Sequence, residues 1–122
     1  MTPLVSLPLA DTPARVKGCC NALPPPLPQR RADELAAVHR ALGDPTRVQL
    51  LHILATVGAP ACVCDFQAAF DLSQPTISHH LAKLREAGLI TSFKRGIWSF
   101  YMLAEDMPAA GRAALEAIDQ SA

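Results

Sequence analysis

Residues 72–88 read LSQPTISHHLAKLREAG, and this stretch predicts a helix with a defined start and end. Ser73 is a good N-cap, Gln74-Pro75 opens the helix, and Gly88 closes it. One face of this helix is apolar and should point into a core, since it carries Ile77, Leu81 and Leu84. The opposite face suits the major groove of DNA, because it presents short polar and basic side chains: Gln74, Pro75, Thr76, Ser78, His79 and Lys83.

The segment before this helix predicts its structural support. Asp44-Pro45-Thr46 is a strong helix start, with Asp44 as the N-cap and Pro45 where its missing amide hydrogen costs nothing. That helix should run to about residue 57 and form the buried centre, because its apolar residues surround most of the axis. A short helix over residues 65–70 and a turn at residues 71–72 complete a helix-turn-helix pattern.

A β-hairpin is predicted after the recognition helix. Residues 89–94 and 97–103 are rich in β-branched and aromatic residues, and Arg95-Gly96 between them supplies a tight turn. Lys94 and Arg95 should therefore form a cationic tip that contacts DNA phosphates. The fold class is mainly α with a β-hairpin wing, a winged helix-turn-helix. A module of this shape used only for protein contacts is the alternative reading.

The two ends of the chain differ in composition. Residues 1–30 hold seven of the eleven prolines and read as an extended arm without a core. Residues 31–122 should form one small domain, which would gain core by dimerising. Helices over residues 32–42 and 107–118 are assigned to a homodimer interface, the second because its small residues permit close packing.

Charge and hydropathy limit the kinds of partner that this protein is expected to bind. The formal net charge is zero, but residues 72–103 carry Lys83, Arg85, Lys94 and Arg95 against Glu86 alone, which favours a local contact with DNA. We expect a cytoplasmic protein without a membrane partner, since the N-terminus lacks a basic signal region and no apolar stretch could span a bilayer. In that reducing compartment the cysteines should be free or metal-bound.

The cysteines form two pairs, Cys19-Cys20 in the arm and Cys62-Val63-Cys64 before the recognition helix. Paired thiols favour a site for a soft ion. Three alternatives stay open at this point: a thiol redox enzyme or oxidant sensor, a DNA-binding module with a structural zinc, and two small apolar residues without a ligand. The redox reading is weak because C-x-C has no neighbouring βαβ pattern.

Three motifs together resemble the ArsR/SmtB family of metal-responsive repressors: LGDPTR at residues 42–47, CVCD at 62–65 and LSQPTISHHL at 72–81. The resemblance implies a homodimeric winged-helix protein, not an enzyme, that binds operator DNA in the ion-free form and is released by the ion. It also implies that Gln74, Pro75, Ser78 and His79 contact the groove.

The CVCD motif resembles the thiolate site of the arsenic-, cadmium- and lead-sensing branch. In the simplest arsenic sensors a third cysteine follows, where this chain has Gln67. Cadmium- and lead-sensing members imply that Cys19 and Cys20 of the arm complete the site across the dimer. Three of the four thiols suffice for arsenite, so we expect As(III) or Sb(III) as the inducer. Cd(II) or Pb(II) is the alternative, and no organic cofactor is expected. The family's site on the last helix has no counterpart, because residues 107–118 lack His.

Overall fold

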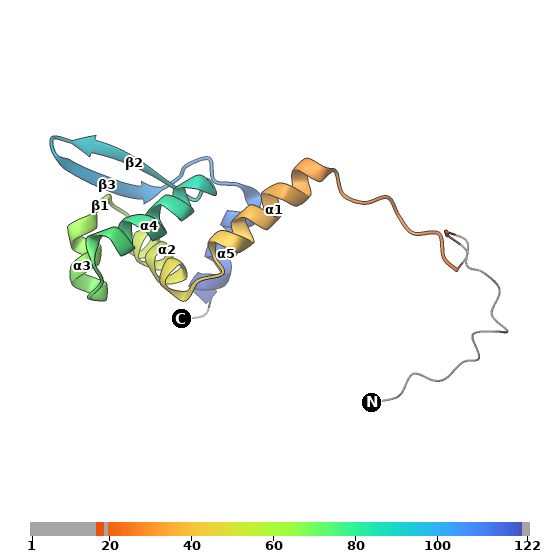
Figure 1. The fold of residues 1–122 in the computed structure, drawn as a ribbon, viewed down its shortest axis with the longest axis horizontal. Helices are drawn as coiled ribbons and strands as arrows, with labels where there is room; N and C mark the ends of the chain where they lie inside the picture. Colours follow the sequence, from red (N-terminus) through yellow and green to blue (C-terminus); the bar gives the residue numbers. More distant parts are fainter. Residues whose placement is uncertain (1–16, 19, 121–122) are drawn as a thin grey trace, which may run out of the picture.

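A computed structural model describes residues 17, 18 and 20–120 of the protein. Within these residues, five helices and a three-stranded antiparallel sheet follow in chain order, with the strands side by side as β1-β3-β2 (Figure 1). The elements are α1 (Gln29–Ala41), α2 (Pro45–Val57), β1 (Ala61–Cys62), α3 (Val63–Phe70), α4 (Gln74–Glu86), β2 (Ile90–Arg95), β3 (Trp98–Leu103) and α5 (Ala109–Gln120). The predicted winged helix-turn-helix, mainly α with a hairpin, is confirmed.

The core is built around α2 and α4. The inner face of α4 buries Ile77, Leu81 and Leu84 completely or nearly so, as predicted. They pack in one cluster with Leu50, Leu51 and Leu54 of α2, Phe66 of α3 and the residues that enter β2. Each fully buried side chain of this kind contributes about 1.5–3 kcal/mol through the hydrophobic effect. The opposite face of α4 is thereby held outward.

The predicted helix starts are confirmed by their hydrogen bonds. The Asp44 carboxylate accepts the amide hydrogen of Thr46 at 2.8 Å and that of Arg47 at 3.4 Å. The Ser73 hydroxyl oxygen accepts the Thr76 amide hydrogen at 3.4 Å. Gly88 follows α4 with a φ of +79°, which a side chain would make unfavourable. Local chemistry thus sets the limits of both helices.

Several boundaries differ from the prediction. α1 begins at Gln29 instead of residue 32, and α3 begins at Val63 instead of residue 65. Strand β1 was not predicted, because two residues are too short to show an alternating pattern and its pairing with Tyr101 and Phe100 of β3 is distant in sequence. On α2, Val57 is 55% exposed, so this last residue of the helix lies outside the core.

His52 of α2 also departs from expectation. As a lone His on an otherwise apolar helix, His52 is predicted from the sequence to be a structural residue with its hydrogen bonds satisfied and not a metal ligand. In the structure the Nδ1 atom of His52 is buried without a hydrogen-bond partner. The prediction of a satisfied histidine was wrong for this atom.

The tip of the wing was predicted one residue too early. Arg95 pairs with Trp98, so Gly96 and Ile97 form the turn, with Gly96 at a φ of +66°. The tip therefore carries Ile97, which is 87% exposed, instead of a cation. Lys94 and Arg95 are exposed at the end of β2, next to the tip.

Helix α5 starts at Ala109, two residues after its predicted start, and packs on its own chain. A Cβ atom at Gly111 would lie 2.5 Å from Leu89 Cδ2 and 2.7 Å from Met107 Cγ. Gly111 is thus needed for packing within one protomer. That α1 and α5 also form a dimer interface stays a prediction.

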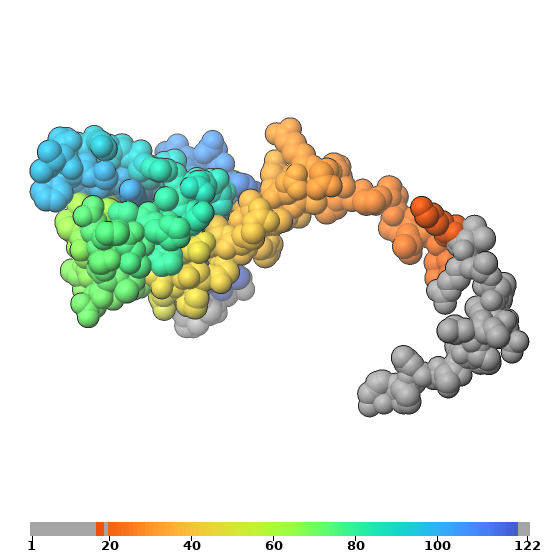
Figure 2. Space-filling model, in the orientation of Figure 1, coloured from red at the N-terminus to blue at the C-terminus, as the bar shows by residue number. Residues whose placement is uncertain are grey.

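The described part of the arm projects from the domain. Residues 20–28 are exposed and continue α1 away from α3 and the sheet (Figures 1 and 2). Among residues 17, 18 and 20–120, no helix combines the length and the apolar character needed to cross a membrane.

Candidate thiolate site and nucleic-acid interface

Cys62 and Cys64 lie where β1 joins α3. Cys62 is the last residue of β1 and the N-cap of α3, and the Asp65 carboxylate accepts its amide hydrogen at 2.9 Å. The Cys64 thiol donates to the Cys62 sulfur, and the two sulfur atoms are 3.0 Å apart. Cys62 is 7% exposed, whereas Cys64 is exposed to solvent. One sulfur atom is thus fixed at the edge of the core, and the other is open to an incoming ion.

The two thiols are placed to share a soft ion. An ion with bonds of about 2.3 Å to each sulfur, as zinc has, holds two sulfurs roughly 4 Å apart or less. The hydrogen bond to Cys62 raises the pKa of the Cys64 thiol, and desolvation and the nearby Cys62 and Asp65 charges act in the same direction. Cys64 is therefore protonated at neutral pH, and an ion that binds must displace its proton.

The structure brings together two of the four predicted thiol ligands. Cys20 is exposed in the arm, which extends from the opposite side of the domain, and Cys19 lies outside the described residues (Figure 1). Within residues 17, 18 and 20–120, no place gathers three His, Cys, Asp or Glu side chains that could hold a metal ion. Gln67, at the position of the absent third cysteine, lies beside the pair.

A groove of about 250 Å³ connects the thiol pair to the recognition helix and the wing. Its walls come from α3, from α4 through Gln74 and Ser78, and from β3 through Trp98, Ser99 and Tyr101, with Ile97 at the rim. The sequence did not predict this groove or a place for Trp98 in it. The wing register that places Trp98 opposite Arg95 was the missing information.

The predicted base-reading residues lie on the outer face of α4. Gln74, Pro75, Thr76 and His79 are exposed, while Ser78 is half-buried where the groove begins. The neighbouring His80 turns inward, and its Nδ1 atom accepts a hydrogen bond from Arg47 Nε at 3.2 Å. The structure therefore separates His79, a candidate DNA contact, from His80, a packing residue.

The cationic residues that were predicted to contact DNA lie at both ends of this surface. Lys83 is exposed near the end of α4, with Nζ 3.9 Å from Glu86 Oε1. Lys94 and Arg95 are exposed on β2, where the Arg95 guanidinium lies 5.9 Å from the centre of the Phe93 ring. This contact directs Arg95 along the wing. Cations thus flank the polar N-terminal half of α4.

Comparison with known proteins places this arrangement among regulators. Residues 44–92 match the family described as "Bacterial regulatory protein, arsR family". The chain is 42% identical over 74 residues to an uncharacterized HTH-type transcriptional regulator of Methanocaldococcus jannaschii, a match that covers 61% of this chain and 82% of that protein. It is 46% identical over 70 residues to the arsenical resistance operon repressor of Escherichia coli K12, covering 57% of this chain and 59% of the repressor, less than two thirds of its length.

A solved structure supports the same arrangement of elements. The transcriptional repressor BigR from Xylella fastidiosa superimposes with a TM-score of 0.60 at 28% sequence identity, covering 76% of this chain and 87% of that one.

Proposed function

The chain belongs to the arsR family of bacterial regulatory proteins, and we propose that it is a repressor released from operator DNA when its thiolates bind As(III) or Sb(III). The observation that carries this proposal is the groove shared by Cys62 and Cys64 with Gln74 and Ser78 of the recognition helix. An ion bound to the two sulfurs would alter the walls against which the reading helix rests. Ion binding at the thiol pair could then release the DNA without coupling between distant parts of the domain.

The relatives' names favour arsenic among the soft ions. Proteins similar to this chain are named arsenical resistance operon repressor in Escherichia coli and arsenic resistance transcriptional regulator in Pseudomonas putida. Arsenite takes three thiolates in a pyramid, whereas Cd(II) and Pb(II) can use three or four sulfurs. Three of the four cysteines in the chain would suffice for arsenite.

The third thiolate must come from outside the groove. In our proposal it is Cys19 or Cys20, carried by the arm of residues 1–30 to the domain of residues 31–122 in the partner subunit of a homodimer. Two features support an intersubunit site: the described arm points away from its own thiol pair, and its proline-rich spacer is stiff enough to reach across a surface (Figure 1). The dimer also presents two recognition helices to two half-sites.

Release can be tested by operator binding during titration with As(III), Sb(III), Cd(II) and Pb(II). For Cys64→Ser we expect unchanged operator affinity and no ion-induced release. Cys64 would bind the ion, and it belongs to α3 and not to the outer face of α4 that would contact DNA. Cys62→Ser should behave alike, and a Cys19→Ser, Cys20→Ser protein should respond weakly. Raised salt, which weakens phosphate contacts, should still release every variant from DNA and serves as the control.

The outcomes separate the alternatives. A structural zinc would show itself if chelation unfolded the protein, whereas an ion-released repressor should bind DNA at least as tightly after chelation. A redox sensor would be supported if a mild oxidant released the wild type but not Cys64→Ser, and if none of the four ions released the wild type. Full ion response by the protein without arm cysteines would overturn the intersubunit site while leaving the repressor assignment intact.

A further inference from the structure

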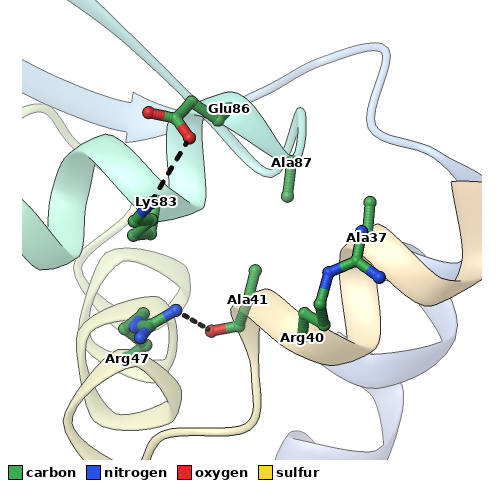
Figure 3. A pocket seen from close by; sticks show the side chains of 7 residues that line it. All are labelled: Ala37, Arg40, Ala41, Arg47, Lys83, Glu86 and Ala87. Carbon is green, nitrogen blue, oxygen red and sulfur yellow. Dashed lines mark hydrogen bonds and ion pairs between the residues drawn. The ribbon is translucent and has the colours of Figure 1, made fainter.

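A second cavity, of about 310 Å³, lies at the other end of α4, away from the thiol pair. It is enclosed by the last turns of α1 and α4 and the first turn of α2 (Figure 3). Arg40, Arg47 and Lys83 line it together with one carboxylate, Glu86. The remaining lining residues are alanines, which leave the space between the charged side chains open.

Arg47 is held in place by two hydrogen bonds, neither of which involves a carboxylate. Its Nη1 atom donates to the Ala41 carbonyl oxygen at 3.2 Å, and its Nε atom donates to His80 Nδ1, also at 3.2 Å. Neither bond neutralises the guanidinium charge. The Asp44 carboxylate interacts with the Arg47 charge through space, but its hydrogen bonds are with amide hydrogens of α2 and it does not line the cavity. Arg47 is thus a pre-oriented cation with N–H groups to spare.

The other two cations are weakly engaged. Within the described part of the chain, the Arg40 side chain makes no hydrogen bond or ion pair, and it lies at the cavity in Figure 3. Lys83 has only the 3.9 Å contact with Glu86, between side chains that are 46% and 66% exposed. An exposed pair of this kind contributes about 0–1 kcal/mol, so the Lys83 ammonium can leave Glu86 for a better partner.

A simpler role for these cations is to offset the negative C-terminal ends of α1 and α4. Each helix end carries about half an elementary charge. Two C-terminal ends and the N-terminal end of α2 sum to about −0.5. The three cations, taken with Glu86 at the cavity and Asp44 at the start of α2, sum to about +1, which is larger. The cavity therefore keeps a positive charge that helix ends do not account for.

We propose that this cavity binds an oxyanion of the phosphate class, held from three directions by Arg40, Arg47 and Lys83. A guanidinium offers paired N–H donors that fit phosphate oxygens, and the ammonium adds a third charge. The same chemistry is presented by a backbone phosphate of DNA and by a free phosphate ion. The site lies apart from the thiol groove, so it does not depend on the identity of the inducing ion.

Thermal unfolding of the full-length protein in sodium phosphate and in sodium chloride at equal ionic strength tests the site without DNA. Arg40→Gln is the test variant because Arg40 is exposed and makes no contact that the fold needs. Arg30→Gln is the matched control, with the same charge change on the same helix at a side chain that is 90% exposed and away from the cavity. Any general stabilisation by phosphate acts on both variants equally.

We expect phosphate to raise the Tm of the wild type and of Arg30→Gln, and the rise to be at least halved in Arg40→Gln. The source of the oxyanion is decided by the salt dependence of operator binding. A slope reduced by about 0.9 in Arg40→Gln, but not in Arg30→Gln, identifies a DNA phosphate. An unchanged slope with a phosphate-dependent Tm identifies a free ion. Equal Tm shifts and equal slopes for both variants would overturn the proposal.

Discussion

The two ends of α4 differ in chemistry although one helix carries both. Its N-terminal half borders the thiol groove with uncharged Gln74 and Ser78, close to Trp98 of the wing. Its C-terminal end borders a cavity lined by Arg40, Arg47 and Lys83. Uncharged donors and acceptors distinguish base edges, whereas cations hold phosphates of any sequence. In the two proposals made above, one helix couples ion sensing to base readout at its N-terminal half and binds an oxyanion by charge at its C-terminal end.

The largest effect should come from weakening the core packing that holds both ends of α4 in place. Leu81 lies between them on the inner face of α4 and is 1% exposed. Leu81→Ala should lower the free energy of unfolding by about 2–5 kcal/mol, because it removes buried apolar surface and leaves a cavity behind. Chemical denaturation measures this, with Ala82→Gly as a comparison that loosens the helix backbone by only about 1 kcal/mol. A decrease no larger than that of the comparison would mean that the core does not hold α4 as described.

The sequence predicted α4 well because the signals that define it are local. Ser73, Pro75 and Gly88 act on their own neighbours, so the start and end follow from a short window of sequence. The thiol pair was also visible in sequence, since Cys62 and Cys64 are separated by one residue. What surrounds the pair was not, because it depends on β1 and on a wing register that only pairing between distant strands determines.

A smaller effect should distinguish the residues that recognise base edges from the residues that bind DNA phosphates. Ser78→Ala with His79→Ala should weaken specific operator binding by roughly 1–3 kcal/mol for each base edge that is no longer recognised, with little change on random DNA. Lys94→Ala with Arg95→Ala should weaken binding to both DNAs and flatten the salt slope. Binding isotherms on operator and random duplexes at several salt concentrations provide the test. If the α4 variant bound both duplexes more weakly by the same factor, the N-terminal half of α4 would not be reading bases.

The cationic end could not be predicted from the sequence. Arg40, Arg47 and Lys83 come from three helices, and no local pattern relates their positions. Lys83 was predicted as a DNA contact because it lies on the outward face of its helix. That pattern did not show that Arg40 and Arg47 lie beside it. Arg47 was part of the LGDPTR motif, but its bonds to Ala41 and His80 depend on how α1 and α4 pack against α2. Clusters of charge between helices therefore require the tertiary structure.

The smallest effect concerns Asp44, next to the cationic end. Desolvation alone would raise the pKa of this carboxyl, but the Thr46 and Arg47 amides, with the charges of His80 and Arg47, lower it below its ordinary 3.8. A pKa lowered by folding contributes stability above the unfolded value and loses it as pH falls through the folded value. Asp44→Asn keeps a capping side chain but cannot titrate. Its Tm should therefore lie slightly below the wild-type Tm at neutral pH and approach it as pH falls below about 4. Thermal unfolding between neutral and acidic pH checks this, and a Tm difference independent of pH would show that the Asp44 charge is not engaged at this end of α4.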